Sequence, residues 1–215
     1  MNKTFLALTI IIGMFLMTSN PATAEWYVGG QAGFVKPNDL KDVKGVGSSK
    51  GISLSDLDLD NALGYGAKVG YFLPDSLDWL GVEFEVFTAN PHIKQQNVTA
   101  GFGGSSSSLG TLDGSHLRII TPALNVIFRF PGYYVEPYAG IGIGAFWGHI
   151  SDSTGSDNDV APGANVLGGL RFYFNKSVAL FTEYKYNYTK FKFKDSQFEA
   201  NYSSHGIFGG LSFHF

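Results

Sequence analysis

The sequence predicts an all-β protein, an eight-stranded antiparallel up-and-down transmembrane β-barrel. Three observations support this fold class. Eight segments alternate apolar with small or polar residues, tight turns alternate with long polar connections, and the charged residues of the segments lie opposite their apolar face. A period of two residues is typical of β-strands with two different faces, and closure into a barrel leaves no strand edge unpaired.

The predicted strands follow one another as 26–35, 57–72, 79–89, 117–130, 134–147, 165–174, 178–189 and 207–215. On the face that we expect to contact lipid, the first four carry Trp26, Val28 and Phe34, then Leu57, Leu59, Leu63 and Val69, then Val82, Phe84 and Val86, and then Ile120, Leu124 and Val126. The last four carry Val135, Ile141 and Ile143, then Val166, Leu170 and Phe172, then Leu180, Tyr184 and Tyr188, and then Ile207, Leu211, Phe213 and Phe215. The other face, rich in glycine, is expected to line the interior.

The connections alternate in length. Residues 74–77, 131–133 and 175–177 form tight turns with suitable turn residues, whereas 36–55, 90–116, 149–163 and 190–203 are long, polar and rich in Gly, Ser and Asp. Short turns on one side and long loops on the other are typical of bacterial outer-membrane barrels. With eight strands, both ends of the barrel domain then lie on the side of the short turns.

The charges distinguish this barrel from a soluble one. Four acidic and four basic residues share the glycine-rich face, and we predict that they form an interior charge network: Lys68, Glu83, Glu85, Arg129, Glu136, Arg171, Glu183 and Lys185. Each of these ions needs a partner, because an unpaired buried charge is costly. In a lipocalin-like barrel the same charges would face water, but a solvated surface gains little from so many glycines.

The first 24 residues precede the predicted barrel. Lys3 lies in a short basic region, residues 5–17 are apolar or small, and Ala22-Thr23-Ala24 matches an A-x-A cleavage site. We therefore expect 1–24 to be a secretory signal peptide and 25–215 to be the barrel domain. The apolar part is too short for a spanning helix.

Composition narrows the function further. Charged residues make up 15% of the chain, below the roughly 25% of soluble domains, and aromatic residues also make up 15%. The absence of cysteine excludes disulfides and thiolate metal sites, and no basic stripe suggests a nucleic-acid partner. We expect no cofactor.

Several motifs are similar to those of the small eight-stranded outer-membrane β-barrel domain family, the porin-like and surface-antigen proteins. They are residues 26–33, 63–71, 138–142, 183–186 and the ending 209–215. The resemblance spans 25–215 and implies a bacterial outer-membrane location, in contact with lipid and lipopolysaccharide. The alternating ending, with Ile207, Leu211, Phe213 and Phe215, resembles the carboxyl-terminal signal for the barrel-assembly machinery.

An eight-stranded barrel is only wide enough for side chains to fill its interior. We therefore expect a non-enzymatic monomer with a closed interior, and a structural or surface-interaction role in which the long loops contact a host or surface ligand. Lys190, Lys192 and Lys194 continue the outward parity of the seventh segment, where lipopolysaccharide phosphates would lie; the alternative is an ordinary loop charge run.

Other functions remain open at this point. The family label also covers small porin-like channels, and some small outer-membrane barrels modify lipid A with Ser and His near the outer rim. Ser203, Ser204 and His205 are the residues that could do so here. A calcium loop at 56–67 is disfavoured, because Asn61 replaces the required Gly and Ala67 the required Glu. We expect the aspartates to face solvent and Leu57 and Leu59 to continue the outward face.

Overall fold

The computed structural model describes residues 25–45, 50–102, 105–112, 115–132, 134–151, 156–193 and 198–215. Most of these residues lie in β-strands; the others form connecting segments, which include one 3-10 turn, η2 (Asp75–Leu77). In this part of the chain, no helix is long and apolar enough to cross a bilayer. The predicted signal peptide, 1–24, lies outside the described residues.

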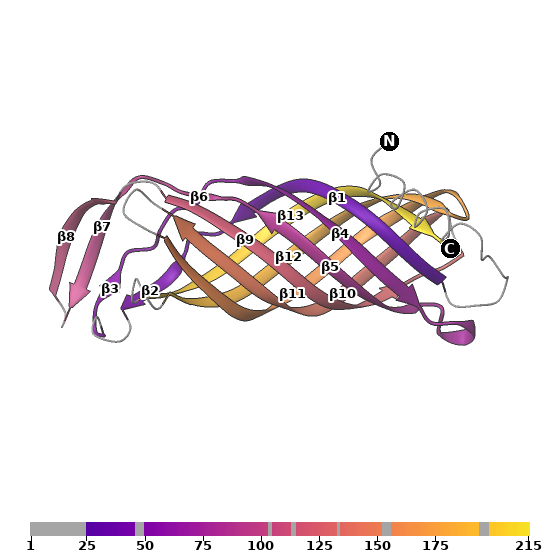
Figure 1. Cartoon of the computed structure of the whole chain (residues 1–215), viewed down its shortest axis with the longest axis horizontal. Coiled ribbons are helices and arrows are strands. Elements are labelled where there is room, and N and C mark those ends of the chain that lie inside the picture. The colour runs from indigo at the N-terminus through magenta and orange to yellow at the C-terminus, as the bar shows by residue number, and fades with distance from the viewer. Residues whose placement is uncertain are drawn as a thin grey trace, which may run out of the picture.

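Eight strands of the described chain close into an antiparallel barrel with the up-and-down order that the sequence predicts (Figure 1). They are β1 (Glu25–Pro37), β4 (Ala62–Phe72), β5 (Leu80–Ala89), β9 (Ser115–Arg129), β10 (Val135–Ser151), β11 (Ser156–Asn175), β12 (Val178–Phe193) and β13 (Phe198–His214).

The last strand closes the barrel on the first. The β1–β13 ladder runs from Tyr27 opposite His214 to Pro37 opposite Ser204. Beyond it, the backbones of Trp26 and Phe215 exchange two hydrogen bonds of 2.9 and 3.0 Å. The final strand therefore pairs with the first, as closure of the predicted barrel requires.

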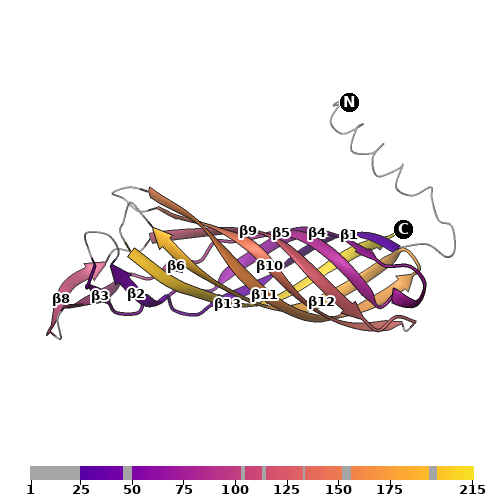
Figure 2. The ribbon, with the colours of Figure 1, turned by 90° about the horizontal axis from the view of Figure 1, so that it is seen from below.

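The short turns, the start of β1 and the chain's last residue all lie at one end of the barrel, which we call the short-turn end (Figures 1 and 2). Gly132 in one of these turns has a φ of +95°, a conformation that glycine adopts at little cost. Rings pack in pairs on the outer wall near this end, with centroids 4.8 Å apart for Trp26 and Tyr71 and 6.1 Å apart for Trp79 and Phe128. Such an aromatic girdle suits a membrane interface.

The opposite end of the barrel carries additional strands, and we call it the extended end. Here β2 (Lys41–Gly45) pairs with the N-terminal part of β13. The sheet continues from β2 through β3 (Ser53–Leu54) to β7 (Gln96–Phe102) and β8 (Ser105–Leu112). A further short strand, β6 (His92–Ile93), pairs with β9. We call β2, β3, β7 and β8 the outer sheet; it projects beyond the barrel wall in Figures 1 and 2.

Much of each connection that we expected to be a polar loop is therefore strand. The β10–β11 ladder continues to Ser151 opposite Ser156, and the β12–β13 ladder continues to Phe193 opposite Phe198. Backbone pairing extends these hairpins, and in the second of them Phe191, Ala200 and Tyr202 also bury their side chains inside the extended end. The alternation of Lys190 and Lys192 with Phe191 continues the seventh segment, but the Gly, Ser and Asp content of these connections led us to expect loops.

The outer and inner faces follow the predicted alternation along the barrel wall. Large apolar side chains remain exposed on the outside, among them Phe34, Phe84, Leu124, Ile143 and Ile207. In water such a surface would be unfavourable, whereas in a bilayer it contacts acyl chains.

Leu57 and Leu59 are an exception, and their prediction was wrong. Both are buried, with 5% and 6% exposure, and they pack inside the extended end instead of facing lipid. Between them and β4 the alternation breaks, because Asp60 and Asn61 are both exposed before the buried Ala62. The segment makes isolated bridges with Leu40 and Ile93 rather than a continuous strand.

Candidate functional site in the barrel interior and on the outer sheet

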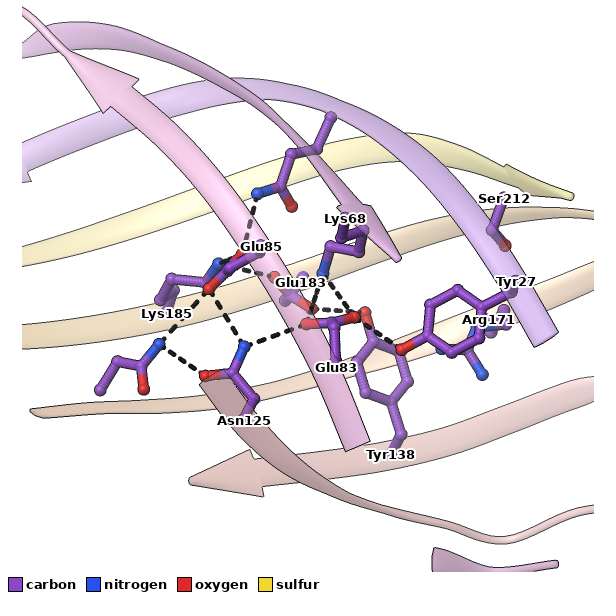
Figure 3. Close-up of polar contacts among 12 residues, drawn as sticks. Tyr27, Lys68, Glu83, Glu85, Asn125, Tyr138, Arg171, Glu183, Lys185 and Ser212 are labelled. Atoms are coloured by element: carbon purple, nitrogen blue, oxygen red, sulfur yellow. Dashed lines mark hydrogen bonds and ion pairs between the residues drawn. The ribbon is translucent and has the colours of Figure 1, made fainter. Parts of the chain in front are cut away.

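A central charge network fills the middle of the barrel (Figure 3). Glu183 of β12 lies at its centre and accepts a hydrogen bond of 2.8 Å from Lys68 Nζ of β4 and one of 2.9 Å from the Tyr138 hydroxyl of β10. Lys185 Nζ lies 3.3 Å from the other oxygen of this carboxylate. Glu183 therefore links two buried ammonium groups.

Two neighbouring carboxylates from β5 complete the network. Glu83 accepts hydrogen bonds from the Tyr27 hydroxyl at 2.7 Å and from Asn125 Nδ2 at 3.1 Å, and it lies 3.3 Å from Lys68 Nζ. Glu85 pairs with Lys185 and also accepts a hydrogen bond of 3.2 Å from Asn125. These five charged groups are at most 6% exposed.

The central network has three carboxylates but only two lysines, so neutral side chains provide the remaining hydrogen bonds to the carboxylates. Gln31 and Asn165 donate to Glu85, each at 3.3 Å, beside the Asn125 contact described above. Hydrogen bonds to charged groups are stronger than neutral ones and offset part of the cost of burial. The tyrosines and amides thus help to stabilise the buried carboxylates beside the lysines.

A second group of ions, the mouth cluster, lies at the short-turn end. Arg171 Nη1 is 2.6 Å from Glu136, and Arg129 Nη1 is 2.7 Å from Glu25 and 3.6 Å from Glu136. His214 Nδ1 lies 2.5 Å from the other oxygen of Glu25. A pocket of about 640 Å³ opens beside these ions to the exterior.

The structure places all eight predicted interior charges inside the barrel, divided between the central network and the mouth cluster. The sequence analysis missed several partners of these charges: Glu25, Tyr27, Gln31, Tyr138, Asn165 and His214. The inward parity of their strands could have placed them on the interior face, but it does not show that they pair with the ions. We had used that parity only for the ions within the predicted segments.

An apolar plug fills the interior between the central network and the extended end. Phe87 and Phe208 lie next to the network, with ring centroids 6.2 Å apart, and Lys185 Nζ is 4.9 Å from the Phe87 centroid. Further out, the plug comprises buried residues from the barrel strands and from the segments that fold back over them: Leu40, Val43, Leu57, Leu59, Ile93, Leu117, Ile119, Phe146, Ala161, Phe191, Ala200 and Tyr202. Ions and packed side chains thus occupy successive levels of the interior.

The lysines that we expected to contact lipopolysaccharide lie on β12, with one exception. Lys190 and Lys192 are exposed and face outward, whereas Lys194 lies outside the described residues. The Lys190 ammonium pairs with Glu199 at 2.7 Å, and the Lys192 backbone N–H donates to Asp159 at 2.6 Å. Acidic groups therefore share this surface with the lysines.

The residues considered for catalysis do not form a catalytic arrangement in the described chain. The Ser203 hydroxyl accepts a hydrogen bond of 2.8 Å from Asn38, and Ser204 points into the barrel. His205 faces outward, where its Nδ1 is 2.6 Å from the Tyr184 hydroxyl. The described residues also contain no group of three His, Asp, Glu or Cys side chains arranged to hold a metal ion.

The assembly-signal residues Ile207, Leu211 and Phe213 face outward on β13, exposed by 64%, 45% and 48%. Phe215 follows at the end of the chain, paired with Trp26. Their apolar stripe lies on the lipid side of the seam where the barrel closes.

The model of the outer membrane protein beta-barrel domain family matches residues 6–215. This chain belongs to that family. The outer-membrane β-barrel prediction and the bacterial outer-membrane location are therefore confirmed. Because barrels of this kind have short periplasmic turns and longer extracellular loops, we assign the short-turn end to the periplasm and the extended end to the cell exterior. No curated protein sequence matches the chain.

Three solved structures of outer-membrane proteins have similar folds. Neisserial surface protein A is 15% identical, with a TM-score of 0.55 over 88% of this chain and 97% of that one. OprG from Pseudomonas aeruginosa is 15% identical, with a TM-score of 0.54 over 90% and 97%. Ail from Yersinia pestis, solved with the heparin analogue sucrose octasulfate, is 17% identical, with a TM-score of 0.50 over 90% and 99%. At these identities the likeness concerns the fold.

Proposed function

We propose that this outer-membrane β-barrel domain protein is a non-enzymatic, monomeric barrel with a closed interior, which binds a surface ligand through its outer sheet. The filled interior is the observation that carries this proposal. The central network and the apolar plug occupy the space through which a solute would have to pass. Proteins that share a barrel fold differ in function through the parts grafted onto it, so we assign the function of this protein to the strands and loops outside the membrane.

The outer sheet supports a role in binding. It extends the sheet by four short strands, so it presents strand backbone beyond the end of the barrel (Figure 2). The segment that contains β2 and β3 and leads back to the barrel, residues 38–60, carries five aspartates and three lysines, and this acidic excess beside the outer sheet does not favour a polyanion such as the one bound to Ail. A neutral or basic protein surface is the better match.

Two further partners follow from positions on the barrel wall. Lys190 and Lys192 would contact lipopolysaccharide phosphates beside their acidic neighbours, since cations attract an anionic headgroup layer. The outward stripe ending at Phe215 would be recognised by the barrel-assembly machinery during insertion. These partners concern anchoring and assembly, whereas the surface ligand concerns function.

A two-arm experiment separates surface binding from anchoring. Cells carrying the intact protein are screened against immobilised host and bacterial surface proteins, beside cells in which a short Gly-Ser linker replaces residues 96–112. We expect the hairpin variant to lose binding but to retain heat-modifiable gel mobility and co-purifying lipopolysaccharide. The double variant Lys190→Ala, Lys192→Ala should lose co-purifying lipopolysaccharide but retain ligand binding and heat-modifiable gel mobility. Equal ligand binding by intact and hairpin-deleted protein would refute the role of the outer sheet.

A further inference from the structure

Two histidines face each other on the extracellular surface. His92 of β6 lies directly opposite His116 of β9 in an antiparallel ladder, and their ring centroids are 4.1 Å apart with an interplanar angle of 62°. Both residues are exposed, so both imidazoles are open to solvent on their outer side. The function proposed above makes no use of this pair.

The backbone around the pair is held in place from below. Ile93 and Leu117, which follow the two histidines in sequence, point the other way and are buried in the apolar plug. The Leu117 N–H donates to Pro91 at 3.0 Å, and the Asp60 N–H donates to the His92 carbonyl at 2.8 Å. Because alternate residues point to opposite faces, this anchoring directs both imidazoles outward, side by side.

We propose that His92 and His116 form a binding site for a divalent transition-metal ion of the zinc class. Neutral imidazole nitrogens are suited to Zn²⁺, Ni²⁺ and Cu²⁺, whereas Mg²⁺ and Ca²⁺ prefer oxygen ligands. A metal held at about 2.0–2.1 Å by one nitrogen of each ring places the two ring centroids about 5 Å apart. Small side-chain rotations from the present separation reach that geometry.

The site has two protein ligands, and its remaining positions are open. Asp60 lies across from His92, but its carboxylate is 3.5 Å from Lys94 Nζ and is engaged there. Water or a carboxylate from a bound partner would complete the coordination. The same outer face carries two positive charges, Arg118 and Lys94, and two negative charges, Asp58 and Asp60. The surface around the two histidines therefore has no large excess of charge of either sign. Metal binding would join β6 to β9 across the ladder.

Zinc titration of the purified, refolded full-length barrel without a polyhistidine tag tests this proposal. Isothermal titration with ZnCl₂ in detergent at neutral pH is compared among the wild type, His92→Asn, His116→Asn and the matched control His205→Asn. We expect one equivalent of Zn²⁺, affinity weakened at least tenfold in either pair variant, unchanged affinity in the control, and no binding of Mg²⁺. Heat-modifiable gel mobility checks that each variant is folded. If an asparagine variant fails to fold, His92→Gln or His116→Gln replaces it in the titration.

Two results would overturn the site. One is the absence of saturable Zn²⁺ binding to the wild type. The other is a Zn²⁺ affinity of the folded double variant His92→Asn, His116→Asn that lies within about twofold of the wild-type affinity, because the ion would then be bound elsewhere. Repeating the titration at pH 5.5 adds a readout of ligand chemistry, because imidazolium cannot ligate and a true histidine site must lose affinity there.

Discussion

Replacing Glu183 with alanine is expected to destabilise the barrel by about 3–5 kcal/mol, the usual cost of breaking a buried ion pair by removing one partner. Glu183 links Lys68 and Lys185 in the central network, and it also accepts a hydrogen bond from Tyr138. Without the carboxylate, Lys68 keeps only Glu83 and Lys185 keeps only Glu85, and the Tyr138 hydroxyl loses its acceptor. Urea unfolding of the refolded protein, followed by tryptophan fluorescence, measures this change.

Two variants make the Glu183 experiment specific. Glu183→Gln keeps the side-chain shape and an acceptor oxygen, so its loss should be smaller than that of Glu183→Ala. Glu199→Gln removes the carboxylate that pairs with Lys190 on the exposed surface, and its effect should be far smaller, because solvent screens such pairs. An unfolding midpoint for Glu183→Ala equal to that of the wild type would mean that the interior network does not hold the barrel together.

Replacing Ile141 with arginine is expected to cost about 2–4 kcal/mol in a lipid bilayer, the typical penalty for a cation on the lipid face at the midplane. Ile141 lies between Val126 and Val166 on the outer wall and is 58% exposed. Strand rise and tilt place it about 15 Å from the periplasmic end of β10. Equilibrium unfolding in phospholipid vesicles gives the value.

Tyr134→Arg is the matched control for depth. Tyr134 is 86% exposed and precedes β10 at the periplasmic end, where a cation reaches the headgroups and costs about 0–1 kcal/mol. If Ile141→Arg were as stable as Tyr134→Arg, the outer face would not be embedded in lipid. Contact of the outer face with lipid would then not explain why the charged side chains lie in the barrel interior.

The alternation of residues was enough to predict the barrel and the location of its charges. Glycine on the same face as Lys68 and Glu183 indicated an interior, because small residues leave room for long ionic side chains. The neutral members of the network were harder to identify. Tyr27 and Asn165 share the inward parity, but nothing in their identity shows that they donate to a carboxylate rather than fill space.

The extracellular part could not be predicted in the same way. Leu57 and Leu59 are separated by one polar residue, as lipid-facing residues of a strand would be. The alternation breaks at Asp60 and Asn61, however, so both leucine side chains point inward and pack in the apolar plug. The outer sheet follows from long-range pairing of β2, β3 and β7, and such pairing leaves little trace in a polar, glycine-rich sequence. The pairing of His92 with His116 depends on the same long-range register.

The central claim is that this barrel is closed, and single-channel recording in a planar bilayer tests it most directly. The purified full-length protein is added at neutral pH, with a large open porin as the positive control for insertion. Because the central network and the plug occupy the interior, we predict that no large, stable conductance accompanies insertion. Steady openings on the nanosiemens scale would contradict the claim and favour a porin-like channel.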